Sequence, residues 1–336
     1  MLIEWLSQVP NPATPFRPAV VARMGRLFGA DRLPQEQYTD PPGDPGLFGP
    51  RSVTWRVHAN PAMVIGGFSA VMLQTLHPLA MAGVADHSAW REEPLRRLSR
   101  TSSFVVATTY GSIPVADAMI EVVKAVHARV VGTAPDGRSY SANDPALLRW
   151  IHVAEVTSFL RAYQQYEPWP LSGADADRYL DEVAVVAERL GATEVPRSRA
   201  QVRAYLREVR PELAAGEQAR GAVEFVRNPL GDDPWTQAAY GLVVQAGIGL
   251  LPGWARAMLG LHQSAVVERT IVRPATWSLI SAMRLATGPP PALIQAQVRC
   301  AMVPAPVGGA GCAATLTPAA QARGAAGPAP VGAGRP

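Results

Sequence analysis

The stretch from Arg97 to Tyr140 contains residues whose types and spacing could do chemistry. It begins with a basic, hydroxyl-bearing group formed by Arg97, Arg100 and Thr101. In a helix Arg97 and Thr101 share a face because they are four residues apart, and Arg100 lies one residue off that face. One histidine, His127, follows within an apolar segment. A cationic group, a hydroxyl and an imidazole in one unit are typical of a binding or catalytic site.

The segment from Pro114 to Gly132 predicts a helix that carries His127 on its apolar face. Proline suits the first helical position, where its missing N–H costs nothing, and glycine is common just past a helix C-terminus. Apolar residues and the histidine recur at three- and four-residue spacing, as on one face of a helix. This face comprises Ala116, Met119, Ile120, Val123, Val126, His127, Val130 and Val131. His127 is therefore expected to point into the interior.

An imidazole in an apolar interior has two explanations. It can be a core histidine whose ring nitrogens are both hydrogen-bonded. It can also be an axial ligand of haem iron, a neutral ring whose second nitrogen is held by a backbone carbonyl. Spacing alone does not choose between them.

An ordered set of short motifs extends over roughly residues 50 to 270. They are His77-Pro78, Asp86-His87-Ser88, Arg97-Leu98-Ser99-Arg100-Thr101, Tyr110-Gly111, His127 to Gly132, Tyr140, and Asp144-Pro145-Ala146-Leu147-Leu148-Arg149-Trp150. In this order they resemble the haem-dependent oxygenase family of the latex-clearing rubber oxygenases and the fungal endoplasmic-reticulum-bound oxygenase MpaB.

The resemblance implies a globin-like helical core with additional helices and a haem b group whose iron is ligated by His127 on the proximal side. It implies an oxygenase that acts on an apolar, lipid- or isoprenoid-like substrate, with O2 and an electron donor as further partners. Two alternatives stay open: a non-catalytic haem protein that binds a gas, and a haem-free protein of the same fold with His127 in its core.

The resemblance also assigns candidate residues on the distal side of the haem. Arg97 and Thr101 are candidate catalytic residues, and Arg97 could bond a haem propionate or bound oxygen; a surface salt bridge is its alternative. In the rubber oxygenases a lysine that can ligate iron precedes the motif's threonine. Arg100 stands there in this chain, and a guanidinium stays protonated and has no lone pair to give. Asp86 is the nearest candidate for the family's acidic catalytic residue.

Further histidines are candidates for the haem pocket. His58, His77 and His87 are spaced like no metal-ligand motif, so a metal site of their own is not expected. His77 or His87 is a candidate to line the haem pocket instead, and His77 is taken as the candidate cofactor-binding residue. His152 and Glu155 are three residues apart on a predicted helix. They form either a second group beside the haem, with His152 binding the cofactor, or a buried, mutually satisfied polar pair, which the spacing favours.

Composition bounds the class of protein. The 336 residues carry a net charge of +4 in dispersed form, which argues against nucleic-acid binding. Only two cysteines occur, with no Cys-x-x-Cys spacing, which is typical of a reducing cytoplasm. The first residues lack the pattern of a signal peptide. Two apolar stretches, 61–85 and 235–255, are interpreted as buried helices, with membrane contact but no membrane span as the alternative.

The expected fold class is all-α, because strand alternation is scarce and no Asn-Gly or Asp-Gly hairpin is recognised between strands. Residues 1–50 are proline-rich and are expected to wrap the core. Residues 51–287 form the predicted haem-binding domain. Within it, one helix is predicted to begin at Asp144-Pro145, an N-cap followed by proline at the first helical position. A second, amphipathic helix is predicted from Ala174 to Leu190 and is expected to end at Gly191. Residues 288–336 are rich in Ala, Pro and Gly and are expected to form a disordered tail.

Overall fold

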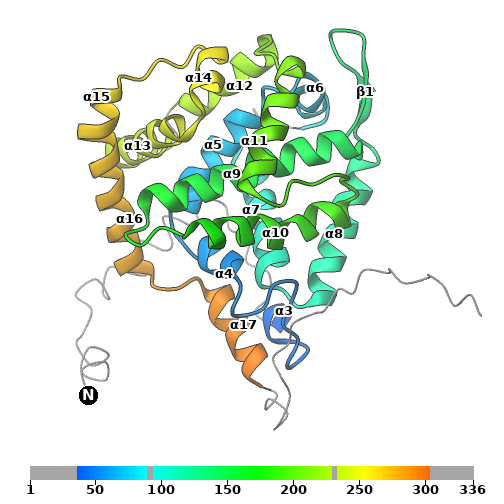
Figure 1. The fold of residues 1–336 in the computed structure, drawn as a ribbon, viewed down its shortest axis with the longest axis vertical. Coiled ribbons are helices and arrows are strands. Elements are labelled where there is room, and N and C mark those ends of the chain that lie inside the picture. Colours follow the sequence, from blue (N-terminus) through cyan, green and yellow to red (C-terminus); the bar gives the residue numbers. More distant parts are fainter. Residues whose placement is uncertain (1–35, 89–93, 229–232, 303–336) are drawn as a thin grey trace, which may run out of the picture. The chain divides into compact units, whose positions relative to one another are not determined.

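A long helix, α9 (Pro145–Tyr166), runs through the core of the protein (Figure 1). The computed structural model describes residues 36–88, 94–228 and 233–302, and only the backbone of residues 36, 37 and 94–98. The Asp144 side chain accepts a hydrogen bond from the Ala146 N–H at the start of α9, and Pro145 occupies its first turn. The sequence predicted this start from the same two residues.

Helix α5 (Met63–Gln74) packs between α9 and α13 (Pro234–Leu250). A glycine stands at each crossing. A Cβ atom at Gly66 would lie 2.9 Å from the Phe159 ring of α9, and one at Gly247 would lie 3.1 Å from Phe68 Cβ. Larger residues would push the helices apart, because packed cores have no spare volume.

Helix α10 (Gly173–Leu190) also packs against α9. It begins after Ser172, whose hydroxyl accepts the Asp175 N–H, and ends at Gly191, whose φ of 112° is left-handed. The sequence predicted this helix and its glycine stop. Tyr179 and Leu180 are buried in the main core cluster.

Helices α7 (Pro94–Tyr110) and α8 (Ile113–His127) pack side by side and lead into a hairpin of two short antiparallel strands, β1 (Val131–Thr133) and β2 (Ser139–Ser141). The predicted helix was too long, because α8 ends at His127 and Gly132 lies in β1, opposite Tyr140. The hairpin was not predicted either, although Asp136-Gly137 forms its turn, with Gly137 at a φ of 86°. All other regular elements of the described chain are helices, so the all-α prediction is confirmed apart from this hairpin.

The other described elements surround this core. They are α3 (Glu36–Thr39), α4 (Val53–His58), α6 (Pro78–His87), α11 (Arg199–Glu208), η2 (Arg210–Glu212), α12 (Glu217–Arg227), α14 (Gly253–Met258), α15 (Ala265–Val267), the π-helical turn η3 (Glu268–Val272), α16 (Arg273–Thr287) and α17 (Pro291–Ala301).

Helix α17 corrects the predicted boundary of the tail. It lies inside the stretch expected to be disordered, and it packs beside α3 and α7 (Figure 1). Its Arg299 side chain is fully buried. The composition rule failed here because this helix combines a buried arginine with a few small or medium-sized apolar residues, Ala292, Leu293 and Ala296, that pack in a core cluster. The rest of the predicted tail, from residue 303, and most of the predicted wrapping segment lie outside the described residues.

Of the described helices, none is long and apolar enough by itself to cross a membrane. Taken together, α5 and α6, bent by 103° at their junction, meet the criterion by length and composition alone.

Candidate functional site

A glycine sets the tight turn between α7 and α8. A Cβ atom at Gly111 would lie 2.3 Å from the Ala107 carbonyl oxygen and 2.9 Å from Val115 Cγ1. Any other residue would therefore force the two helices apart. This tight connection, followed by Pro114 in the first turn of α8, places α8 directly against α7.

The inward face of α8 opens toward its C-terminal end. Ala116 and Ile120 on this face are fully buried, whereas Val123 and His127, the next residues along it, keep part of their surface accessible. Val126, predicted to belong to the same face, is 45% exposed and lies on the solvent side. The packing of α8 is thus least complete beside His127.

His127 is the last residue of α8 and has the features of a ligand. Its Nδ1 atom is buried without a hydrogen-bond partner. Burial lowers the pKa of His127, so the ring is neutral at neutral pH and keeps a lone pair. A buried ring nitrogen without a partner is unusual in a purely structural histidine, because such groups are normally satisfied.

His58 is the contrasting case of a satisfied core histidine. Its Nδ1 lies 2.8 Å from the Thr109 hydroxyl and its Nε2 lies 3.0 Å from the Tyr179 hydroxyl. Burial lowers the pKa of His58 to about 3, so it remains neutral. Both nitrogens are engaged within the core, which leaves His58 no free position for a ligand.

His152 and Glu155 share one face of α9 but do not satisfy each other. The structure shows no hydrogen bond between them, and His152 Nε2 is buried without a partner, so the expected satisfied pair is wrong. Both keep accessible surface, although Leu148 and Phe159, one turn away on either side, are buried. Packing is therefore locally incomplete at the middle of this face.

Desolvation controls the protonation of these two groups. It lowers the pKa of His152 to about 4 and raises the pKa of Glu155 to about 7. The imidazole is therefore neutral, and the carboxyl group is close to half-protonated at neutral pH. The sequence indicated that the two residues lie close together. It gave no sign of the raised pKa, which depends on helices that pack around α9 from elsewhere in the chain.

His77 does not share the face of His152. It precedes α6, is buried, and its ring lies 6.1 Å from the ring of Trp150, between centroids. Residues two positions apart in a helix point in directions that differ by about 200°. Trp150, and His77 beside it, therefore lie on the other side of α9 from His152. His77 Nδ1 has no partner and Nε2 lies 3.8 Å from a carboxylate oxygen of Glu212. Burial lowers the pKa of His77, and Glu212 acts in the opposite direction.

Asp86 anchors the hairpin instead of facing His127. It accepts a 2.6 Å hydrogen bond from the Tyr140 hydroxyl. Burial is the main cause that raises the pKa of Tyr140 to about 12, and the hydrogen bond to Asp86 contributes in the same direction. The Tyr140 ring lies over Gly132, where a Cβ atom would come within 2.5 Å of the hydroxyl. Asp86, a candidate catalytic residue in the sequence, thus attaches to α6 the hairpin that begins at Val131, four residues after His127.

Arg100 and Thr101 both lie exposed on α7, whereas the preceding residue Ser99 is buried. The backbone of Arg97 lies on the same helix, one turn before Thr101, and its side chain lies outside the described residues. The structure therefore places these three residues on the helix that packs against α8.

The described parts of the chain contain no group of three His, Cys, Asp or Glu side chains arranged to hold a metal ion. Single histidines with unpartnered nitrogens are present instead.

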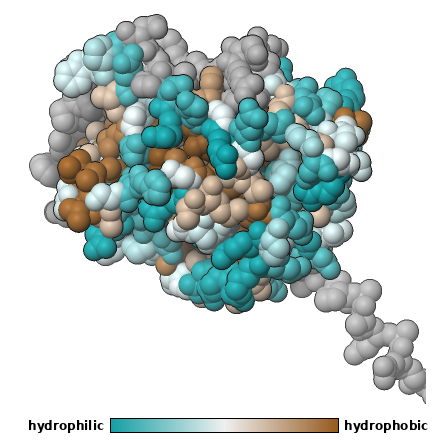
Figure 2. Space-filling model, turned by 90° about the horizontal axis from the view of Figure 1, so that it is seen from above, coloured by the Kyte–Doolittle hydropathy of each residue, from teal (hydrophilic) through white to brown (hydrophobic). Residues whose placement is uncertain are grey.

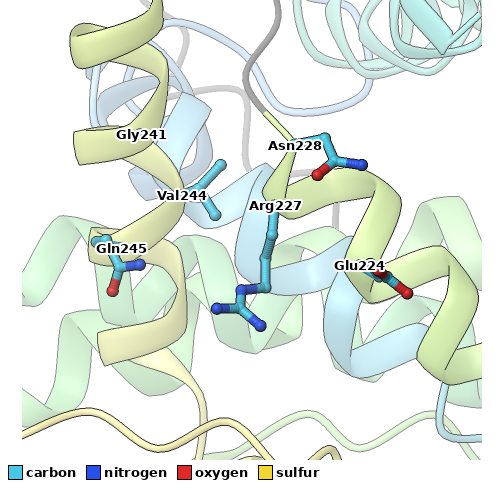
Figure 3. A pocket seen from close by; sticks show the side chains of 6 residues that line it. All are labelled: Glu224, Arg227, Asn228, Gly241, Val244 and Gln245. Carbon is cyan, nitrogen blue, oxygen red and sulfur yellow. The ribbon is translucent and has the colours of Figure 1, made fainter.

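A separate pocket of about 300 Å³ lies between α12 and α13. Its lining consists of Glu224, Arg227, Asn228, Gly241, Val244 and Gln245. Figure 3 shows the Arg227 side chain extending into the gap between the two helices, near Val244. No histidine lines it, so it is distinct from the face of α8 that carries His127.

Comparison with known families agrees with this architecture. A family model described as the catalytic domain of ER-bound oxygenase mpaB/B′ and rubber oxygenase matches residues 55–285. The match includes α7, α8, the hairpin and α9, and it leaves out α17. No curated protein and no solved structure matches the chain. The chain belongs to the family of the mpaB and rubber oxygenase catalytic domains.

Proposed function

We propose that this protein is a haem b-dependent oxygenase that acts on an apolar, lipid- or isoprenoid-like substrate, with O2 and an electron donor as further partners. Membership of an oxygenase family supports the reaction class and an oxidoreductase activity. The observation that carries the haem assignment is His127, a neutral imidazole with a buried, unpartnered Nδ1 at the open end of the α8 face. Bound haem would supply the oxygen chemistry.

The residues present fit a haem better than a bare metal ion. A porphyrin brings four nitrogen ligands, so one protein imidazole is enough to ligate the iron. A non-haem site needs several protein ligands, and the described residues provide no such cluster. We therefore propose that His127 is the residue that would ligate the iron.

The polar residues around this helix pair have separate proposed roles. Arg97 and Thr101 on α7 are proposed to contact propionate or oxygen, as the resemblance implies, and Arg100 is proposed to contribute positive charge without ligating iron. His152 is proposed to contact the cofactor from α9, because its Nε2 is buried and unpartnered. Asp86 is proposed to act indirectly, by fixing the hairpin behind His127.

The absorbance spectrum of the purified protein tests the proposal. The wild type should show a Soret band, and His127→Ala should fold but retain far less haem. His262→Ala is the matched control, since His262 is exposed on the loop between α14 and α15. If His127→Ala keeps a full Soret band, the ligand assignment is wrong and His152→Ala is the next variant to measure. A wild type that binds no haem on reconstitution contradicts the proposed function.

A further inference from the structure

The run of α15, η3 and α16 exposes an unusual amount of apolar surface. Val266 is 69% exposed, Ile271 61%, Trp277 47% and Leu285 65%. Figure 2 shows apolar side chains gathered at the left edge of the molecule, the side on which Figure 1 places α15. Contiguous exposed apolar patches are rare on monomers and mark interaction sites.

The opposite side of this run is firmly packed. Val272 and Ile280 are buried in a core cluster with α13, and Thr276 is fully buried. Glu268 accepts hydrogen bonds from Gln165 of α9 and from Arg273. The run is therefore a fixed, two-sided helix whose outer side remains apolar.

The charged residues along this part of the chain are mostly basic. Between residues 261 and 301 the sequence contains a single acidic residue, Glu268, and its side chain is only 12% exposed because it turns inward. Arg269 and Arg273 are exposed beside the apolar residues. A helix with an apolar outer side and basic residues next to it is typical of binding at a membrane interface.

The same charges disfavour a second copy of this chain as the partner. A two-fold dimer brings the same patch together from both copies. Arg269 would then face its own counterpart in the other copy, because Glu268, the single acidic residue of this stretch, already pairs with Arg273 at 3.1 Å. Anionic lipid headgroups can neutralise Arg269, and the acyl chains accept the apolar side chains.

We propose that the outer side of α15, η3 and α16 docks on the surface of an anionic lipid bilayer. Ile271 and Trp277 enter the interfacial region, and Arg269 contacts lipid phosphates. Docking would hold the protein where apolar molecules dissolve. That benefit rests on the proposed function, whereas the docking itself rests only on this surface.

Sedimentation with vesicles tests the docking. Wild-type protein should bind vesicles that contain both phosphatidylserine and phosphatidylcholine. Its binding should be much weaker to vesicles of pure phosphatidylcholine, and also to the mixed vesicles at high salt. Ile271→Glu and, separately, Val266→Glu should weaken binding at least about tenfold, and Arg269→Glu should remove most of the preference for phosphatidylserine. Trp169→Glu is the matched control, because Trp169 is 82% exposed on the turn after α9, outside this run. Thermal unfolding confirms that each variant is folded.

Three results would overturn the proposal. The wild type could fail to bind either kind of vesicle. Trp169→Glu could weaken binding as much as Ile271→Glu, which would point to another surface. Light scattering could show that Ile271→Glu turns a dimer into a monomer while vesicles are not bound, which would assign the face to a second copy. The measurement needs no haem, so a missing Soret band would count against the proposed function and leave the docking result unaffected.

Discussion

Replacing Arg299 by methionine should strongly destabilise the fold, although Arg299 lies outside the residues that match the family. Its guanidinium Nη1 donates to the carbonyls of Tyr38 and Tyr110 at 2.7 and 2.9 Å. Nε donates to the Asp44 carbonyl at 2.8 Å, and Nη2 donates to that of Gly111 at 3.3 Å. One side chain thus joins α17, the loop after α3 and the C-terminal end of α7.

The size of the effect follows from the carbonyls that would lose their donor. Tyr38, Tyr110 and Gly111 are buried, so water replaces the guanidinium poorly there, whereas Asp44 is half-buried. A buried acceptor left unpaired costs about 1–3 kcal/mol. Burial disfavours the charged guanidinium and lowers the pKa of Arg299. Replacing it by an uncharged side chain removes this desolvation penalty and offsets part of the cost. We expect Arg299→Met to lower the free energy of unfolding by about 3–5 kcal/mol.

Urea denaturation measures the effect, with Arg207→Met as the matched control. Arg207 is exposed on α11, and its loss should change the free energy of unfolding by less than about 0.5 kcal/mol. Hydrogen exchange should show faster exchange in α17 and the last turn of α7. A value for Arg299→Met within about 0.5 kcal/mol of wild type would refute the reasoning, because three buried carbonyls would then have found other donors.

Three further predictions concern Asp86, Glu155 and Arg100. Asp86→Asn should lower the free energy of unfolding by about 1–2 kcal/mol and lower the haem content, because the Tyr140 hydroxyl loses a charged acceptor. Tyr140→Phe should produce the same loss. If the losses of the two single variants add up in the double variant, as measured by urea denaturation, the pairing is contradicted. Folding raises the pKa of Glu155 from 4.5 to about 7, so the folded state binds the extra proton in that window and the free energy of unfolding falls as pH rises through it. The free energy of unfolding of Glu155→Gln, relative to that of wild type, should therefore rise by about 2–3 kcal/mol between pH 4.5 and pH 7. If the difference between the two free energies stays the same across this range, Glu155 is not desolvated. Arg100→Lys should add a nitrogen ligand to the haem-loaded protein and shift its optical and EPR spectra toward six-coordinate low spin. Position 100 is exposed in the protein without haem, so this prediction requires bound haem to cover it, and a lysine desolvated in this way can lose its proton. Unchanged spectra would show that residue 100 does not face the iron.

The sequence by itself determined the helical class and several helix ends. The start of α9 at Asp144-Pro145 and the stop of α10 at Gly191 were predicted because caps act through neighbouring residues, within one turn. The ordered motifs identified the family because motif order is a property of the chain.

Tertiary contacts decided the end of α8 and the existence of the hairpin. The apolar pattern continues past His127, and an isolated pair of three-residue strands is not stable by itself. Asp86 and His87 of α6 hold the hairpin through Tyr140 and the Val131 carbonyl. These partners are far away in sequence, so no local pattern contains them.

Tertiary structure also separated positioning residues from candidate ligands. His58, His127 and His152 look alike in sequence, yet His58 has both nitrogens bonded while each of the others has one without a partner. The assignment of residues 288–302 to a tail failed for the same reason, since Arg299 bonds carbonyls that are 188 to 261 residues away. Burial and hydrogen-bond satisfaction depend on which segments meet in space, and only the folded chain decides that.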